Sequence, residues 1–147
     1  MNGFERPEGD AGAVKAAAAA LGALGGDVKT QEQHLVDGFA AAIASWHGPR
    51  ADTFRNASAG IQAQAKMAES ALTNVASLLQ AYGTALQQAQ QDIADLEQQA
   101  NQRQSAAEAS IARMRPDDPE VDRAWQHASM AIGSLVQEAE TVRSHLR

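Results

Sequence analysis

The sequence predicts an all-α protein built from three helices, and three observations lead to this prediction. Apolar residues recur at spacings of three and four along most of the chain, which is the period of an amphipathic helix. Ala is abundant and aromatic residues make up only 4% of the chain, which favours helices packed side by side over a sheet. Turns at Gly48-Pro49 and around Pro116 divide the pattern into three parts.

The charge and the cysteine content argue against nucleic-acid binding and against thiol chemistry. Twelve Lys and Arg residues stand against 18 Asp and Glu, so the formal net charge is −6 at pH 7. Nucleic-acid affinity comes from neutralising phosphates, so we expect no nucleic-acid partner. The sequence contains no cysteine, which excludes disulfides and thiol chemistry. The longest apolar run, Ala16–Leu24, is too short for a transmembrane segment, and we expect none.

The first part of the chain combines an irregular start with a long helix. Residues 1–9 contain Pro and Gly without a helical period, and we expect a flexible arm. The first helix should run from Asp10 to Ser45. Gly25-Gly26 interrupts it, and because two helix-interior glycines cost about 1 kcal/mol each relative to Ala, we expect a kink or fraying there.

Trp46-His47-Gly48 forms the corner between the first two helices. Gly48 tolerates the positive φ of a tight turn, and Pro49 suits the first helical position because its missing N–H is not needed there. A Trp at a corner can lie across both helices, so we expect Trp46 to be a buried anchor. The triplet also fits an ordinary hairpin corner closed by an aromatic side chain.

The second helix should run from Pro49 to about Arg113, with apolar residues at a strict seven-residue spacing typical of coiled-coil packing. Between Asn56 and Gln91 the only charged residues are Lys66 and Glu69, so this stretch should pack on more than one side. An uncharged polar surface is the alternative. The residues that we expect at a partner interface are Phe54, Ile61, Leu72, Val75, Leu79, Tyr82 and Leu86.

A third helix should follow, because Pro116 ends the second helix and Asp118 offers an N-cap. Short turns force antiparallel neighbours, so it should lie on the second helix near residues 89–114, with its end close to the arm. Arg103 would then pair with Glu138 or Glu140. The predicted organisation is an arm at 1–9, a hairpin at 10–115 and an additional helix at 116–147. Because a rod two helices thick exposes much of its Ala-rich seam, we expect an oligomer.

Residues that could carry catalysis or bind metal lack the necessary spacing. No His has an acidic residue at di-iron spacing, and no His pair has the i, i+4 spacing of a zinc helix. The sequence contains no Gly-X-Ser-X-Gly nucleophile motif. We therefore expect no enzymatic activity, no metal and no cofactor. The four histidines are His34, His47, His127 and His145.

The corner and its flanks carry a family resemblance. Trp46-His47-Gly48 ends one Ala-rich helix, Pro49 to Phe54 (Pro-Arg-Ala-Asp-Thr-Phe) begins a second, and Tyr82 lies in its third quarter. Over roughly residues 10–100 the chain resembles the Trp-X-Gly (WXG) family of small helical-hairpin substrates of type VII (ESX) secretion. The resemblance implies that Trp46 and Gly48 form the turn and secretion motif.

Further expectations follow from the resemblance alone. It implies a homodimer, or a heterodimer with another WXG-like helical protein, in an antiparallel four-helix bundle. It implies a protein that is cytoplasmic before export and is then secreted or co-secreted without a cleaved signal peptide. In the family the turn of one subunit lies beside the partner's C-terminal tail, whose Tyr-X-X-X-Asp/Glu signal is directed at the secretion ATPase.

Two departures from the family pattern leave a second function open. Leu86, not an acidic residue, stands four positions after Tyr82, which is the only Tyr. The chain also has a third helix that the short family members lack. The alternative is an intracellular coiled-coil scaffold, or an adaptor or chaperone for a toxin partner, that is not exported.

Overall fold

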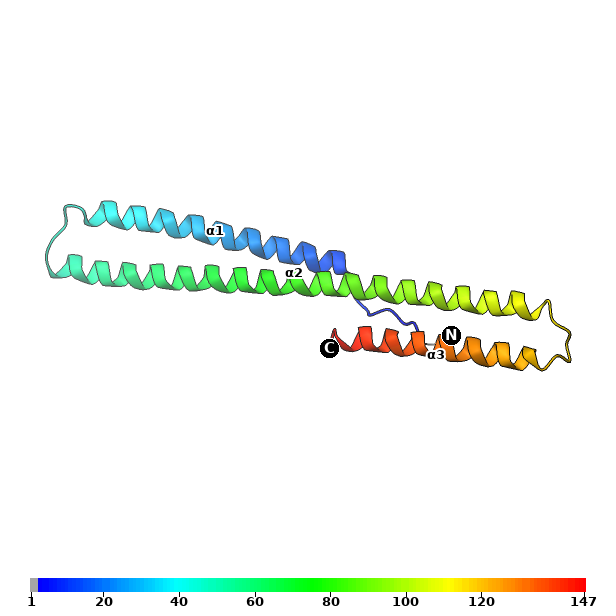
Figure 1. The fold of residues 1–147 in the computed structure, drawn as a ribbon. Coiled ribbons are helices and arrows are strands. Elements are labelled where there is room, and N and C mark those ends of the chain that lie inside the picture. The colour runs from blue at the N-terminus through cyan, green and yellow to red at the C-terminus, as the bar shows by residue number, and fades with distance from the viewer. Residues whose placement is uncertain (1–2) are drawn as a thin grey trace. The chain divides into compact units, whose positions relative to one another are not determined.

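The computed structural model describes residues 3–147, and these form three α-helices without a strand. Helix α1 spans Ala11–Ile43, α2 spans Pro49–Ile111 and α3 spans Glu120–Ser144. Figure 1 shows α1 alongside the first part of α2, and α3 alongside its last part. The prediction of an all-α fold with hairpin-like pairing of α2 with both other helices is confirmed.

The chain divides into two units, which we describe separately. The hairpin unit is Gly12–Gly83, and the C-terminal unit is Met1–Ala11 together with Thr84–Arg147. Helix α2 is continuous and supplies residues to both units. The hairpin unit therefore contains most of α1 and the first part of α2, whereas the C-terminal unit contains the rest of α2 and α3.

One glycine of the pair in α1, Gly25, packs against α2 in the hairpin unit. The expected kink or fraying is wrong, because α1 runs unbroken through Gly25 and Gly26. Gly25 is buried, and a Cβ there would lie 3.4 Å from Thr73 Oγ1 and 3.5 Å from Leu72 Cβ. A Cβ at Gly25 would thus make ordinary contacts with α2, whereas a larger, branched side chain would press on Thr73 and Leu72.

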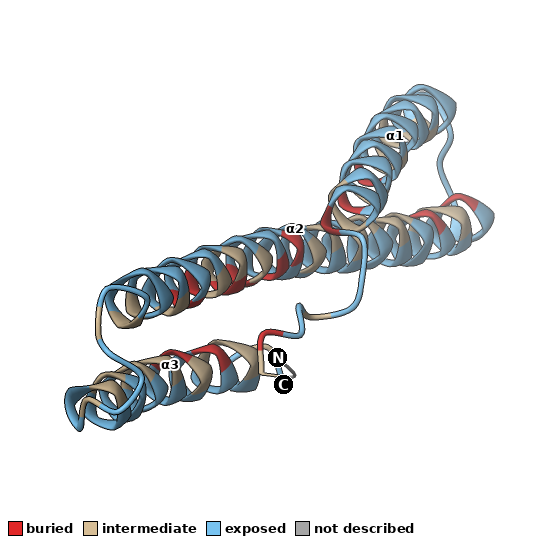
Figure 2. Ribbon diagram, turned by 90° about the vertical axis from the view of Figure 1, so that its right-hand side faces the viewer, coloured by how far each residue is buried: buried red, intermediate tan, exposed pale blue. Residues whose placement is uncertain are grey.

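The C-terminal unit has an apolar core between α2 and α3. Figure 2 shows buried residues on both helices of this unit. This confirms that the third helix docks on the second, as the apolar stripe along residues 121–146 predicted. The core cluster consists of Phe4, Ile93, Leu96, Ala100, Leu135 and Ala139, with Ile132, Val136 and Val142 packed against it.

The start of the chain makes contacts that the sequence analysis missed. Of the expected arm, residues 3–9 lie within the described part of the chain, and Met1 and Asn2 lie outside it. Phe4 is only 7% exposed and belongs to the core of the C-terminal unit. Gln90 Nε2 donates to the carbonyl oxygens of Pro7 and Gly9, both at 2.9 Å. Residues 3–9 are therefore packed against α2 and α3.

The start of α3 lies one residue later than predicted, and Asp118 is not its N-cap residue. Pro119 is the N-cap residue, with φ −62°, and the backbone N–H of Glu120 donates to Asp118 Oδ1 at 3.0 Å. The side chain of Asp118 thus satisfies a helix N–H that would otherwise lack an intrahelical partner.

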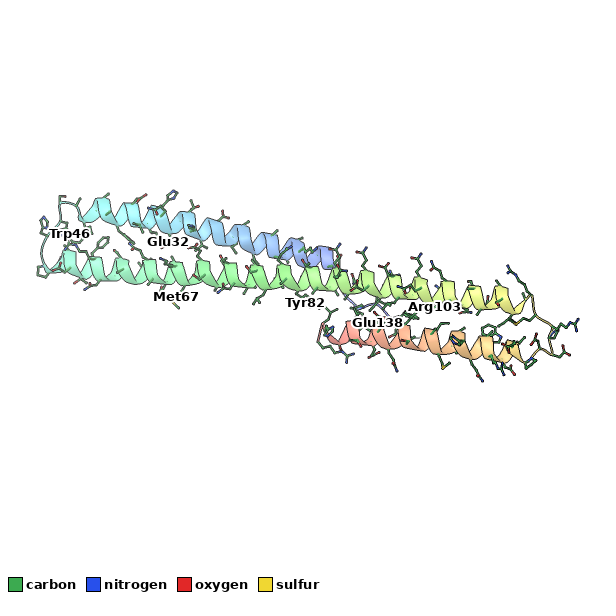
Figure 3. The ribbon with its side chains drawn as sticks, viewed as in Figure 1. Glu32, Trp46, Met67, Tyr82, Arg103 and Glu138 are labelled. Atoms are coloured by element: carbon green, nitrogen blue, oxygen red, sulfur yellow. The ribbon has the colours of Figure 1, made fainter. Side chains whose placement is uncertain are left out.

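The ion pair expected for Arg103 is wrong. Arg103 is exposed, and Glu140 pairs with Arg143 on its own helix. Glu138 borders a hollow together with Asp92 and Asp95, about two turns before Arg103 on α2. Figure 3 shows Arg103 and Glu138 at different levels of the helix pair. Arg103 was expected between the helices because it continues the seven-residue repeat that runs through Val75 and Leu96. A straight helix has 3.6 residues per turn and drifts from that repeat, which leaves Arg103 exposed.

Candidate functional site

Three aromatic side chains meet near the turn of the hairpin unit. The ring centroid of Phe54 lies 5.6 Å from that of Phe39 on α1, in an edge-to-face arrangement at 87°. On its other side, the Phe54 centroid lies 5.5 Å from that of Trp46 at 50°. Such contacts stabilise by about 0.5–1.5 kcal/mol beyond area burial. Phe54 therefore links α1 to the turn.

The conformation of the turn depends on the positive φ of Gly48 and on a hydrogen bond from Arg55. Gly48 has φ +106°, which confirms the predicted left-handed conformation, and α2 begins at Pro49 as expected. Arg55 Nη2 donates to the carbonyl oxygen of Trp46 at 3.1 Å, and Arg55 Nη1 contacts Asp52 Oδ1 at 2.8 Å. The sequence analysis missed Arg55, although its i, i+3 spacing from Asp52 was a readable signal.

Trp46 does not have the environment that we expected. Its side chain is 40% exposed, and its ring contact is with Phe54. The prediction of a buried anchor is therefore wrong for the single chain. The corner is nevertheless aromatic, and Figure 3 shows Trp46 at the turn between α1 and α2.

The predicted partner interface contains residues in two different environments within the hairpin unit. Phe54, Leu72 and Leu79 are half-buried. Ile61, Val75 and Tyr82 are exposed. This difference follows from helix geometry, because residues three or four apart lie on nearly the same face of a helix. The half-buried residues lie on the face toward α1, and the exposed residues lie beside that face.

An apolar face extends over both helices of the hairpin unit. Leu24 and Leu35 are also exposed, and each directly precedes a covered residue, Gly25 and Val36. The exposed residues of α2 follow the same rule: Ile61 precedes Gln62, Val75 precedes Ala76, Leu78 precedes Leu79 and Tyr82 precedes Gly83. A residue one position before a contact residue is turned by about 100° around the helix axis. Because α1 and α2 are antiparallel, this turn brings the exposed side chains of both helices to the same side of the hairpin.

Two large side chains enlarge this surface. Met67 is 72% exposed and Leu78 is 71% exposed. Figure 3 shows Met67 on the side of α2 that is turned away from α1. Neither residue falls on the seven-residue spacing from which the interface was predicted, so neither was predicted. A wider stripe at 3.6-residue spacing includes both. We call Leu24, Leu35, Ile61, Met67, Val75, Leu78 and Tyr82 the apolar face.

Charged side chains are few along the α2 part of this surface. Lys66 and Glu69, the only charged residues of α2 between 56 and 91, border a hollow with Lys29, Glu32 and His34 of α1. From residue 70 to residue 91, α2 carries no charge at all. A charge-poor row of large apolar side chains is typical of a surface that binds protein rather than one that stays in water.

Leu86 does not belong to the apolar face. Its side chain is 1% exposed and lies in the C-terminal unit. A Cβ at Gly9 would lie 3.1 Å from Leu86 Cδ2, so the start of the chain covers this side chain. The prediction that Leu86 contributes to a partner interface is wrong, because residues of the same chain already bury it.

Among residues 3–147, no group of three or more His, Asp or Glu side chains is placed to hold a metal ion. None of the described helices combines the length and hydropathy needed to cross a membrane. The chain matches no protein-family model, and neither the curated proteins nor the solved structures contain a match.

Proposed function

We propose that this chain is a WXG-like helical hairpin of a type VII (ESX) secretion system that acts by binding a second WXG-like hairpin. The observation that carries the proposal is the apolar face, which spans α1 and α2 and is poor in charge on α2. The bound state would be an antiparallel four-helix bundle, as a homodimer or a heterodimer. The role is protein binding rather than catalysis.

The size of the exposed side chains supports this proposal. Monomeric proteins rarely expose a continuous row of Leu, Ile, Val and Tyr side chains, because covering each would gain about 1.5–3 kcal/mol. A two-helix surface of this kind is half of a four-helix bundle, in which apolar residues of two hairpins interlock. The second hairpin therefore has the shape and the chemistry that this face needs.

The turn supports the link to secretion. Trp46 and Gly48 occupy the corner of a helical hairpin, as the WXG resemblance requires, and the exposed indole of Trp46 is available for recognition. On this proposal the corner, together with the tail of a partner that carries the export signal, is read by the secretion ATPase. The chain would leave the cytoplasm with its partner.

The docked third helix favours a second candidate, an intracellular adaptor or chaperone for a toxin partner. Leu135 and Ala139 of α3 lie in a core with α2, so the segment that follows α2 is packed rather than left as a tail. A packed segment is less accessible to export machinery than an extended one. Intact protein in the culture filtrate, dependent on the secretion ATPase, would favour secretion over the adaptor role.

A matched pair of charge substitutions tests the binding surface. Val75 directly precedes the covered residue Ala76, and Ser77, also exposed, directly follows it on the opposite flank. Val75→Glu should abolish assembly, because a charge would be buried at the interface, whereas Ser77→Glu places the same charge in water and should leave assembly unchanged. Leu72 and Leu79 are less suitable sites because their half-buried side chains also support the hairpin.

Sedimentation velocity of the wild type and both variants gives the readout, with each protein alone and mixed with a WXG-like hairpin protein where a neighbouring gene encodes one. The proposal predicts a dimer for the wild type and for Ser77→Glu, and a monomer for Val75→Glu. A wild type that stays monomeric with and without the neighbouring hairpin refutes it, as does equal assembly of the two variants.

A further inference from the structure

The start of the chain occupies a groove between α2 and α3 in the C-terminal unit. Phe4 packs among Ile93, Leu96, Leu135 and other residues of the core cluster. The segment from residue 4 to residue 9 is non-helical and joins α1 only after Gly9, which has φ +125°. It could therefore leave the groove without unfolding a helix.

The backbone of Gly3 lies close against the side chain of Val136 on α3. A Cβ built at Gly3 would lie 2.5 Å from Val136 Cγ1 and 2.7 Å from Cγ2. Side chains cannot approach so closely, and the branched, stiff Val136 cannot turn away. A larger residue at position 3 would therefore force the start of the chain or Val136 to shift. By contrast, a Cβ at Gly133, one turn earlier on α3, would meet no atom within 4 Å.

Polar groups fix the direction of the segment. Arg143 Nη2 donates to the carbonyl oxygen of Gly3 at 3.4 Å, and Arg143 Nη1 lies 3.9 Å from Glu5 Oε2. Arg143 Nε is buried and has no hydrogen-bond partner among the described residues. Further along, Arg6 Nη2 lies 3.6 Å from Glu97 Oε2. The segment is therefore held mainly by the side chain of Phe4 and the carbonyl oxygen of Gly3, since the ion pairs of Glu5 and Arg6 are exposed and contribute little.

We propose that this groove is an exchangeable peptide-binding site, and that residues 3–9 of a second copy of the chain can replace the chain's own segment. The second copy has the right chemistry because its segment would repeat every contact described above. Exchange of an identical terminal element between copies is a low-cost route to a dimer. In the single chain the tethered segment has an effective concentration of about millimolar, so the site stays closed to weak competitors.

Two complementary full-length variants test the exchange. The first carries Gly3→Ala, which prevents its own segment from seating beside Val136, and Glu97→Cys. The second carries Val136→Phe, which fills its own groove and frees its segment, and Arg6→Cys. Because the natural sequence has no cysteine, a short bismaleimide links the two chains only if the new thiol at position 6 of one reaches the new thiol at position 97 of the other.

The exchange predicts a cross-linked heterodimer in the mixture and none of this product with either variant alone. Adding Phe4→Ala to the second variant should lower the yield at least tenfold. A synthetic peptide of residues 1–9 should abolish the product, and the same peptide with Phe4→Ala should not. Dimerisation through the apolar face would not respond to either peptide, so the two proposals fail independently.

Absence of the heterodimer, with both variants as helical as the wild type by circular dichroism, overturns the proposal. A product that the peptide of residues 1–9 does not suppress also overturns it. If Gly3→Ala itself loses helix, Phe4→Leu replaces it in the first variant, since Leu weakens the seating of the chain's own segment while keeping part of the apolar packing. A direct measurement completes the test: the labelled peptide should bind the Gly3→Ala chain at least tenfold more tightly than the wild type.

Discussion

Replacing Phe4 with Ala should loosen the C-terminal unit while leaving the hairpin unit intact. Phe4 is 7% exposed and is the aromatic residue of the core cluster. Buried Phe→Ala substitutions cost about 3–5 kcal/mol. We expect the lower end, about 3 kcal/mol, because a segment near the chain terminus can collapse into part of the space that it leaves.

Hydrogen exchange followed residue by residue measures this effect. In the wild type the amides of residues 121–142 should be about as protected as those of residues 93–110, since both helices share one core. At about 1.4 kcal/mol per tenfold change, 3 kcal/mol raises the opening of both segments about a hundredfold. Amides of residues 20–40 in α1 lie in the hairpin unit and should exchange at the wild-type rate.

Phe4→Leu is the matched control, because it keeps a large apolar side chain and should lose only part of the protection. Two results would refute the reasoning. Unchanged exchange in α3 would mean that Phe4 does not hold the unit together. An equal rise in α1 would mean that the chain unfolds as one cooperative body.

Two other substitutions test the packing of the hairpin unit by thermal melting. Trp46→Ala should lower the free energy of unfolding by about 2 kcal/mol. This is less than the roughly 3–5 kcal/mol expected for a buried Trp, because Trp46 is 40% exposed. An unchanged melting temperature would show that the contact with Phe54 contributes nothing to stability. Gly25→Val should destabilise the hairpin unit, because the new side chain would press on Thr73 and Leu72. Gly26→Ala, which has open space around it, should stabilise the unit by about 0.5–1 kcal/mol. Equal responses to the two substitutions would show that the contact at Gly25 is unimportant.

The helices and their ends could be predicted because their signals are local. Gly48 and Pro49 set the first turn, and Asp118 and Pro119 set the start of α3, through conformational preferences that each residue carries with it. The spacing of apolar residues predicted the docking of α3, since an amphipathic helix must cover its apolar stripe.

The candidate site was predicted only in part. The corner at Trp46 is aromatic, and Ile61, Val75 and Tyr82 are exposed, which the proposed binding surface needs. Met67 and Leu78 escaped the prediction because they lie off the strict seven-residue repeat. The arginine that holds the turn, Arg55, escaped because it binds a backbone carbonyl nine residues earlier.

The sequence by itself determined that three helices form and where they begin and end, because helix periodicity, Gly and Pro act over a few residues. Only the tertiary structure decided which apolar residues stay exposed. Tyr82 and Leu86 stand one turn apart in the same pattern, yet one is exposed and the other buried. The difference arises from the start of the chain, where Phe4 and Gly9 cover part of the C-terminal unit. No local pattern encodes contacts between residues about eighty positions apart, because they depend on how the folded helices bring distant segments together.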